Sequence, residues 1–440
     1  MNKTLCALAV GTALAWPAAH AAELQDALRA AQLADPTLAG AMANRDAAHE
    51  NIAIARARLL PQVNLQSTMQ RTDQTTTSSF GTNSFEGPSK NTALSVRQGI
   101  YRPRDWAGVD VGKAQAAYGD YKLASAMADL WNRTTAAWID VLAATAARDA
   151  YRLPIASAEA SAQQEQRRLQ MGDGTRDQAA EAAAQLVESR AQLANAESDL
   201  RARRQAFQLL TRLEPTGFEA RRIPPLDRLP MVLPTEEDAL RRIVDTNPEL
   251  LATRAAEQVA ERRLAQSSAD HRPTLDLVAA ASRAQNDSTN TLGTRYRNQQ
   301  FGLQLQVPIY AGGGVSAIER QTAAQYAAAS ADRSALEQKL RTQVSGDYEL
   351  LRGLRERMRS GQELLGAARE QKRGAELSLR GGLKTWADVN QADQLIARRT
   401  VELAQLTTGA MKVQSRLLAL LPVSEPAWIQ WTTQLSAAVR

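Results

Sequence analysis

The sequence is poor in the residues that carry redox or metal chemistry. It contains one cysteine, Cys6, and three histidines among 440 residues. Cys6 lies in an N-terminal segment that we expect to be removed, so the mature chain can form neither a disulfide nor a thiolate metal site. The zinc-protease pattern H-E-x-x-H, a phosphate-binding loop with its Lys-Ser/Thr, and G-x-S-x-G are also missing. These absences argue against an enzyme and predict that the chain needs no cofactor and no metal.

Long apolar runs are also absent beyond the N-terminus. No run of 18 or more apolar residues occurs there, which excludes a membrane-spanning helix. The apolar run from Leu5 to Trp16 is shorter, follows Lys3 and precedes Ala19-His20-Ala21, a pattern typical of a secretory signal peptide. We therefore expect residues 1–21 to be removed and the mature chain to begin at Ala22. The formal charge of +6 is modest and spread along the chain, so we predict no nucleic-acid partner.

The sequence contains an internal duplication. Asp26-Ala27-Leu28 recurs as Asp238-Ala239-Leu240, and Pro61 recurs as Pro273. Chance similarity between alanine-rich helices would not place such landmarks in the same order, so we infer two copies of one unit. Each copy also carries a seven-residue apolar repeat, which predicts coiled-coil packing. These repeats are Ala179, Leu186, Leu193, Leu200 and Phe207 in the first copy, and Val389, Ile396, Leu403, Ala410 and Leu417 in the second.

Each copy has the pattern of helix, strand, loop, strand, long helix, tight turn and helix. We place the first copy at 22–215, a connector at 216–235, the second copy at 236–421 and a C-terminal tail at 422–440. The long helix expected over 104–170 would be about 100 Å in length. Such a rod cannot be buried in a globule of this size, so it must pack against its return helix and against neighbouring chains. Trp131 and Trp138 are expected on its packing seam.

The expected strands alternate apolar and polar residues. Val63, Leu65 and Met69, for example, are separated by polar residues. Each strand has about ten residues, the length of a tilted transmembrane β-strand. The polar stretches 71–92 and 286–298 are expected to contain loops in water. The strands are predicted at about 62–72, 92–102, 274–284 and 299–310.

The pattern alone also fits a soluble hairpin, but the secretion signal and the long helices favour membrane strands. Four strands cannot close a barrel, and an open edge in lipid would leave backbone groups without hydrogen bonds. Several chains must therefore share one barrel. This reasoning predicts an oligomer without giving the number of chains.

An ordered set of short motifs resembles the TolC family of outer-membrane efflux and secretion proteins. The segment from Gly382 to Val389 fits the turn pattern G-x-x-x-x-x-D-V, and its counterpart from Gly172 to Ala179 has Gln178 in place of the aspartate. A proline precedes the first strand of each copy, and an apolar-Pro-Ile-Tyr sequence closes the last strand at 307–310. The resemblance covers essentially the whole mature chain.

The resemblance implies a mainly helical fold with a membrane β-barrel. Three chains would form a twelve-stranded barrel in the lipid of the outer membrane and an α-helical tunnel in the periplasm. The turns at about 171–178 and 381–388 would form the periplasmic tip. That tip would contact a periplasmic adaptor (membrane fusion) protein and, with it, an inner-membrane ABC or proton-driven transporter.

The resemblance also implies which residues close the tip. Asp388 aligns with a constriction aspartate, Lys384 with a gating arginine, and Gln391 with a second acidic position. Glutamine at 178 and 391 predicts a less acidic entrance, unless Asp177 and Asp393 also face the lumen. The gate candidates are Asp388, Lys384, Gln391, Arg176, Asp177 and Gln178. The expected adaptor contacts are Gly172, Gly174, Thr175, Gly382, Leu383 and Thr385.

Three copies of Asp388 brought together by symmetry would repel one another and raise the pKa of that carboxyl unless Lys384, Arg176 or a cation compensates. The simpler alternative is that Asp388 and Lys384 are solvated turn residues. Because only the second turn keeps its aspartate, we predict that the second hairpin carries more of the gate.

An export duct is therefore the predicted function, and a periplasmic helical adaptor or scaffold is the rival. Within the duct hypothesis, type I protein secretion and small-molecule efflux with a proton-driven pump both remain open. The Gly-Asp-Gly-Thr-Arg turn at 172–176 and the lack of a lipid-anchor cysteine favour protein secretion.

Overall fold

The computed structural model describes residues 23–230, 232–286, 295–420 and 425–439. The expected signal peptide lies outside the described residues. The chain divides into two units. We call Met1–Pro36, Ala128–Leu240 and Gln343–Arg440 the helical unit, and Thr37–Met127 with Arg241–Thr342 the sheet unit. Each unit takes segments from both copies of the duplication. In the described part of the chain, no helix is both long enough and apolar enough to cross a membrane.

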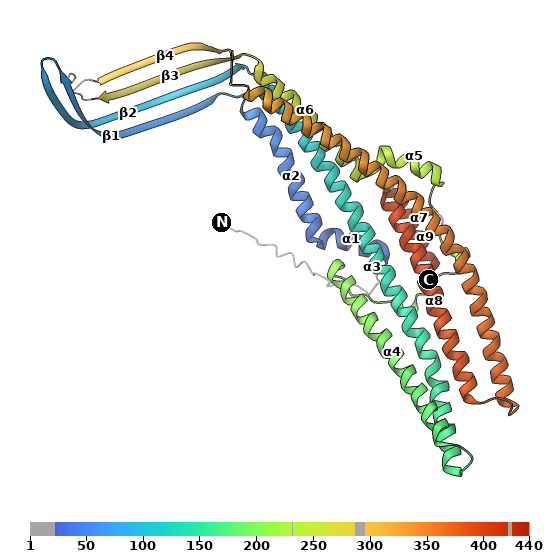
Figure 1. Ribbon diagram of the computed structural model, residues 1–440. Coiled ribbons are helices and arrows are strands. Elements are labelled where there is room, and N and C mark those ends of the chain that lie inside the picture. The colour runs from blue at the N-terminus through green and yellow to red at the C-terminus, as the bar shows by residue number, and fades with distance from the viewer. Residues whose placement is uncertain (1–22, 231, 287–294, 421–424, 440) are drawn as a thin grey trace, which may run out of the picture. The chain divides into compact units, whose positions relative to one another are not determined.

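The sheet unit contains four antiparallel strands in the order β1-β2-β3-β4 (Figure 1). The strands are β1 Gln62–Ser78, β2 Gly81–Tyr101, β3 Thr274–Asn286 and β4 Arg295–Gln306. The segment before β1 forms two helices, because the first ends at Ala34 and Pro36 begins the second, as the backbone restriction on a residue before proline predicts. The shorter helices in and beside this unit are α2 Pro36–Ala57, α5 Glu236–Thr246, α6 Pro248–Ser268 and the 3₁₀ turn η3 Ala269–His271.

The first two strands are longer than the alternation predicts. The stretch 71–92 was expected to contain a loop, but β1 and β2 continue through it to a two-residue turn at Ser79-Phe80. Cross-strand polar pairs, such as Arg71 with Glu86, hold this part of the ladder together. The prediction was wrong because apolar–polar alternation marks only strands with one face in an apolar environment. A ladder of backbone hydrogen bonds can also form between strands that are polar on both faces.

The last strand is displaced from its expected position. It was predicted at about 299–310, but β4 begins at Arg295 and ends at Gln306. Pro308 has no N–H group to donate to a ladder, so the strand ends before it, although the apolar alternation in the sequence continues to Ile309. Val307, Ile309 and Tyr310 are consequently exposed beyond the sheet.

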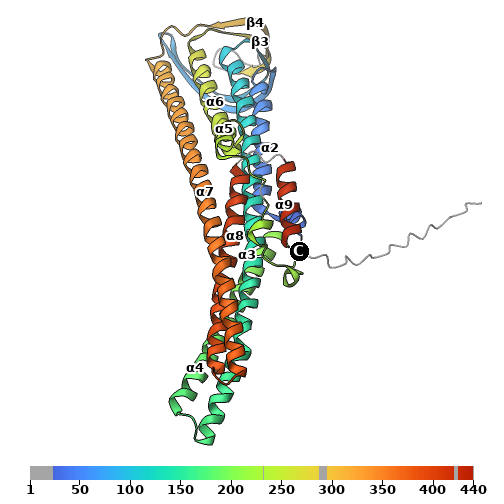
Figure 2. The same cartoon turned by 90° about the vertical axis from the view of Figure 1, so that its right-hand side faces the viewer.

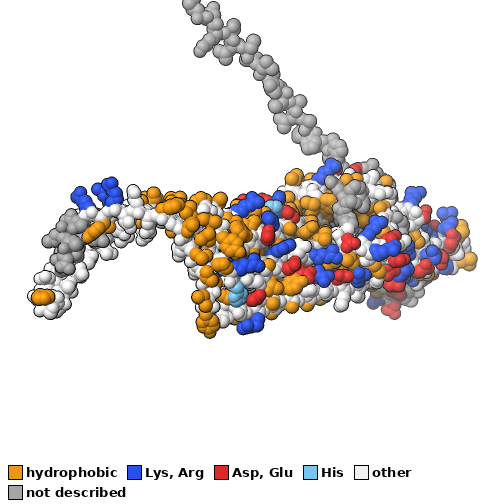
Figure 3. All heavy atoms as spheres, turned by 90° about the horizontal axis from the view of Figure 1, so that it is seen from above, with side chains coloured by type: hydrophobic (Ala, Val, Ile, Leu, Met, Phe, Trp, Pro, Cys, Tyr) orange, Lys and Arg blue, Asp and Glu red, His pale blue; other side chains and the backbone are white. Residues whose placement is uncertain are grey.

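One face of the sheet is apolar across all four strands. Leu65 pairs with Leu94 between β1 and β2, and Leu277 pairs with Leu303 between β3 and β4. The face is open in the isolated chain, since Phe301 is 77% exposed. Polar pairs such as Asn64–Ser95 and Asp276–Gln304 lie on the opposite face. An apolar outer face with a polar inner face is typical of a strand that separates lipid from a water-filled interior. Figure 3 shows hydrophobic side chains gathered over part of the sheet and few of them near the end of the β1–β2 hairpin.

The helical unit consists of two long hairpins with short helices beside them. The helix expected over 104–170 is α3, at Pro103–Met171, and it contributes residues to both units. The other helices are α1 Leu24–Ala34, α4 Arg176–Thr211, α7 Gly314–Arg380, α8 Trp386–Leu420 and α9 Glu425–Val439, with 3₁₀ turns η1 Phe218–Ala220 and η2 Leu226–Arg228.

Within this unit α8 lies beside both α3 and α7 (Figures 1 and 2). Lys412 of α8 pairs with Asp140 of α3, and Arg416 of α8 pairs with Asp347 of α7. Four of the five residues in the second apolar repeat are buried, Leu403 being the half-buried one. This burial agrees with the packing seam that the seven-residue spacing predicts.

Aromatic residues form part of the core of the helical unit. Trp138 is fully buried and lies 5.6 Å, between ring centroids, from Phe218. Trp131 packs against Trp428 at 5.6 Å, so both tryptophans of α3 take part in packing as expected. The region designated a C-terminal tail contains α9, and the indole N–H of its Trp431 donates to Gln414 of α8 at 3.2 Å. This segment is therefore a packed helix.

Candidate functional site

The first hairpin turn is closed by a capping box. α3 ends at Met171, and Gly172 adopts a left-handed φ of 82°, which a residue without Cβ adopts at little cost. The Thr175 hydroxyl accepts a hydrogen bond from the N–H of Gln178 at 3.2 Å, and the Gln178 side-chain oxygen accepts one from the N–H of Thr175 at 3.2 Å. These two bonds satisfy backbone donors at the start of α4 that otherwise have no partner in the helix.

The second turn has a matching cap with a charged acceptor. α7 ends at Arg380, Gly382 has a φ of 71°, and α8 begins at Trp386. The Asp388 carboxylate accepts hydrogen bonds from the Thr385 N–H at 2.8 Å and from the Thr385 hydroxyl at 2.9 Å. The backbone bond from Thr385, then its hydroxyl bond, and more weakly the charge of Lys384, hold the pKa of Asp388 below its usual value.

The position shared by Gln178 and Asp388 therefore has a structural role in both copies. Each is the third residue of a helix whose capping threonine stands three positions earlier. The Thr-x-x-Gln/Asp spacing that marks this cap is visible in the sequence. An amide and a carboxylate can both accept the bond from threonine, which explains how Gln178 replaces an aspartate without loss of the turn.

The remaining gate candidates surround these caps. Lys384, Gln391, Arg176, Asp177 and Gln178 are exposed, and Asp388 is half-buried. Among the expected adaptor contacts, Leu383 is 85% exposed, an unusual degree for a leucine. Gly172, Thr175 and Gly382 are exposed, while Gly174 and Thr385 are half-buried. The structure thus places eleven of the twelve residues at the two turns or in the first turn of the helices that follow them, and Gln391 in the second turn of α8.

Asp393 does not fulfil the compensating role suggested for it. The residue is 3% exposed, and its carboxylate lies 2.6 Å from the ammonium nitrogen of Lys372 in α7. Burial lowers the pKa of Lys372, but the hydrogen bond and charge of Asp393, aided by Glu376, outweigh burial and raise it overall. Asp393 therefore ties α8 to α7 and cannot line a lumen, because its surface is covered by its own chain.

A polar bridge joins the two hairpins two residues beyond Asp388. Asn390 is fully buried, and its amide N–H donates to the Gln185 side chain of α4 at 3.1 Å. Its side-chain oxygen lies 3.5 Å from the hydroxyl of Ser157 in α3. A cavity of about 180 Å³, lined by both hairpins, adjoins this bridge and includes Glu165, Gln178 and Thr385. When two hairpins separate, hydrogen bonds of this kind can be replaced by hydrogen bonds to water at a modest net free energy. Separating an apolar contact would cost more, because apolar surface would be exposed to water.

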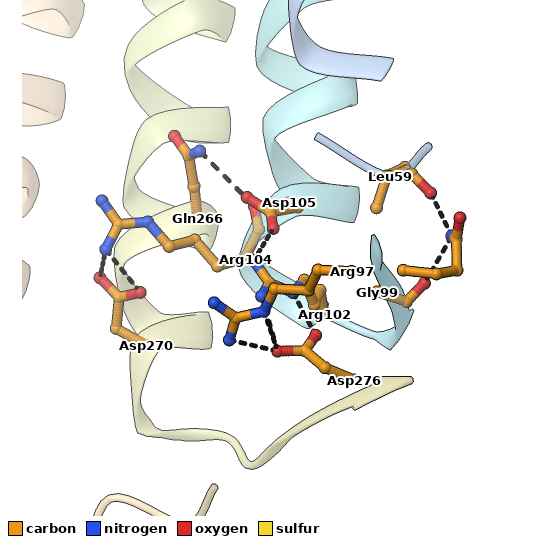
Figure 4. Close-up of polar contacts among 10 residues, drawn as sticks. Leu59, Arg97, Gly99, Arg102, Arg104, Asp105, Gln266, Asp270 and Asp276 are labelled. Carbon is orange, nitrogen blue, oxygen red and sulfur yellow. Dashed lines mark hydrogen bonds and ion pairs between the residues drawn. The ribbon is translucent and has the colours of Figure 1, made fainter. Parts of the chain in front are cut away.

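A second charged cluster lies in the sheet unit where strands give way to helices (Figure 4). Asp276 of β3 is buried, and its carboxylate accepts hydrogen bonds from Arg97 of β2 at 2.9 Å and from Arg102 at 2.6 Å. Arg102 also reaches Asp105 in the first turn of α3 at 3.3 Å. Its hydrogen bond to Asp276 raises the pKa of Arg102. The cluster fixes the direction in which α3 leaves the sheet, and the sequence analysis did not identify it.

Comparisons with known proteins agree with this architecture. The family described as "Outer membrane efflux protein" matches the chain twice, over residues 27–211 and 239–421, which confirms the duplication. The "Proteases secretion protein PrtF" of Dickeya chrysanthemi is 28% identical over 412 residues, covering 90% of this chain and 87% of the relative. The "Alkaline protease secretion protein AprF" of Pseudomonas aeruginosa is 26% identical, covering 91% of this chain and 84% of the relative.

The fold also matches solved structures. The outer membrane protein VceC from Vibrio cholerae superposes with a TM-score of 0.74 at 16% identity, covering 90% of this chain and 95% of that one. At this identity the match concerns the fold alone.

Proposed function

We propose that this chain, which belongs to the outer membrane efflux protein family, is one subunit of a conduit through which an export system passes its substrates across the outer membrane. The chain lies in that membrane, as its relatives do. The observation that carries the proposal is the sheet, whose apolar face spans four strands while its opposite face is polar. A passive conduit needs both surfaces, one toward lipid and one toward water.

The proposed assembly is a homotrimer. β1 and β4 are the two edges of the sheet, and an edge in lipid is tolerated only when another strand pairs with it. Pairing β1 of one chain with β4 of the next closes a barrel, and three chains give about twelve strands, above the eight that a small barrel needs. The long hairpins of the three chains then enclose a periplasmic tunnel.

The proposed substrates are proteins exported by a type I system. Two relatives that span about nine tenths of this chain are named for the secretion of proteases. The partners would be a periplasmic adaptor protein at the exposed turns and an inner-membrane ABC transporter. The second candidate is efflux of small molecules with a proton-driven pump, supported by the relative named "Outer membrane efflux protein BepC".

The proposed gate lies at the two turns. Opening would separate the second hairpin from the first, which requires the Asn390–Gln185 bond to exchange for water. Asp388, Lys384 and Gln391 on one turn, with Arg176, Asp177 and Gln178 on the other, would set the charge at the entrance.

The test is deletion of the gene, followed by comparison of secreted proteins and of antibiotic tolerance. Loss of a secreted protein with unchanged tolerance would support type I secretion, and the reverse would support efflux. The wild-type protein should remain in the membrane after a high-salt wash and migrate as an oligomer in mild detergent. A chain released by salt as a monomer would refute the conduit and favour a periplasmic adaptor or scaffold.

A further inference from the structure

The outer part of the β1–β2 hairpin extends beyond the rest of the described sheet. The β1–β2 ladder continues to the pair Ser78–Gly81, whereas β2 pairs with β3 only between Ser89 and Tyr101. Residues 71–88, which we call the arm, therefore form a two-stranded ladder of their own within the part of the chain that the structure describes. Figure 1 shows that the arm does not continue straight but bends toward the outer ends of β3 and β4.

The arm is unsuited to lipid. Its only apolar residues are Phe80, Phe85 and Pro88, and the rest are mainly threonine, serine, asparagine and glutamine. The apolar face of β1 ends at Met69, just before the arm begins. A lipid-facing strand needs an apolar residue at every second position, so the arm lies in water beyond the lipid-facing part of the sheet.

The arm is an ordered hairpin. The hydroxyls of Thr77 and Thr82 are 3.2 Å apart across the ladder, and Arg71 pairs with Glu86 at 2.8 Å nearer its base. Ser78 accepts a hydrogen bond from the N–H of Phe80 at 3.4 Å within the turn. Gly81, the first residue of β2 after the turn, has a positive φ of 136°, which glycine adopts more readily than other residues. An ordered arm can hold its tip at a defined place.

The tip of the arm carries a bare aromatic ring. Phe80 lies in the two-residue turn, and its side chain is 100% exposed. One exposed phenylalanine on a monomer is unremarkable, but rotational symmetry presents the same residue once from every copy. Between residues 72 and 85 the only charged residue is Asp73. Several arms can therefore approach one another with little repulsion, whereas the arm lacks the basic cluster that would favour an anionic lipid headgroup.

The arm is long enough for the tips to meet. In the proposed twelve-stranded barrel, strands about 4.8 Å apart and tilted by about 40° lie on the order of 12 Å from the barrel axis. Residues 72–78 span about 23 Å in extended form. An arm that bends over the end of the sheet therefore reaches the axis.

We propose that the arms of three copies meet over the outer mouth of the barrel through Phe80, so that each arm docks on second and third copies of this chain and narrows the exit. This inference rests on the proposed function, because it requires a shared barrel. In this arrangement the Phe80 ring of each copy packs against the Phe80 rings of the other two copies, and the contact removes all three rings from water.

The test uses disulfide formation in the assembled protein. The only native cysteine is Cys6, in the segment that we expect to be removed, so Phe80→Cys introduces a single thiol into the mature chain. Mild oxidation of intact cells is expected to produce a covalent dimer, because a disulfide forms only when Cα atoms come within about 7 Å. Ser89→Cys, at the base of the arm, is the matched control. Its copies should stand about 20 Å apart on the barrel wall and give no dimer.

The outcomes separate this inference from the proposed function. A detergent-stable oligomer that conducts ions, but whose Phe80→Cys thiol reacts with an impermeant maleimide and never forms a dimer, overturns the arm contact alone. A thiol that is shielded from maleimide and yet forms no dimer also overturns it, because the cover is then something other than a second copy. Equal dimer yields from Phe80→Cys and Ser89→Cys overturn it as well, whereas a monomer without conductance overturns the conduit itself. Phe80→Ala should raise single-channel conductance without altering the oligomer.

Discussion

Replacing Asp393 by asparagine should weaken the second hairpin far more than an equivalent change weakens the first. Asp393 is 3% exposed and pairs with Lys372 at 2.6 Å, so the substitution leaves a mostly buried ammonium group with only the more distant Glu376, at 3.6 Å, as a counter-ion. Removing one partner of a buried ion pair costs about 3–5 kcal/mol. Because a quarter of the Lys372 side chain is exposed to solvent, we expect a cost just below that range, about 2–3 kcal/mol. The contribution of Lys372 to stability is complete below the ordinary lysine pKa of 10.5 and is lost only as the pH rises through its raised pKa, because the charged form is the one that pairs with Asp393. The loss caused by the substitution is therefore measured at neutral pH, where Lys372 is charged.

The first hairpin provides the control. Glu159 of α3 and Arg190 of α4 also form an interhelical pair, at 2.9 Å, but their side chains are 43% and 59% exposed. Glu159→Gln should cost at most about 1 kcal/mol, because exposed pairs contribute little. The assay is urea unfolding of the purified oligomer, followed by helical circular dichroism and by protease cleavage near the second turn. A double variant, Lys372→Met with Asp393→Leu, should recover most of the loss, since apolar residues can replace a buried pair. Equal losses from Asp393→Asn and Glu159→Gln would refute the reasoning that burial sets the strength of these pairs.

Three further outcomes are expected. Asp276→Asn should reduce assembly of the oligomer by leaving Arg97 and Arg102 without their buried acceptor, while the exposed Glu86→Gln should not, and gel electrophoresis in mild detergent would measure the difference. Asp388→Ala should cost about 1 kcal/mol of helix stability through the lost cap, and Asp388→Gln should restore the cap. The stabilisation by Asp388 should be complete above its ordinary pKa of 3.8 and decline as the pH falls through the lowered value, which an acid titration of helicity would measure. If Asp388→Ala leaves single-channel conductance and opening unchanged, the gate role is wrong. Asn390→Leu should keep the fold but slow opening, because a buried apolar contact replaces a bond that water can exchange; faster opening in planar bilayers would contradict this.

The two turns show how a family motif and a physical role can be separated. The resemblance marks Asp388 as a constriction residue, whereas the structure shows that its carboxylate also caps α8. Gln178 performs the same capping in α4 without a charge. A variant that removes the side chain therefore tests two roles at once, and only the glutamine substitution separates the charge from the cap.

The sequence by itself determined the duplication, the long helices, the four strands and the positions of the turns. These features follow from local periodicity, from proline and glycine, and from the order of recurring motifs, all of which can be read along one chain. It did not determine the length of β1 and β2, because a polar ladder leaves no apolar alternation to detect. Only the tertiary structure showed that Asp393 pairs with Lys372 and that Asp276 gathers Arg97 and Arg102, since such pairs join helices and strands that lie far apart in the sequence. Whether a charged residue faces a lumen or its own chain depends on which helix packs against it, and the spacing of residues along one helix does not carry that information.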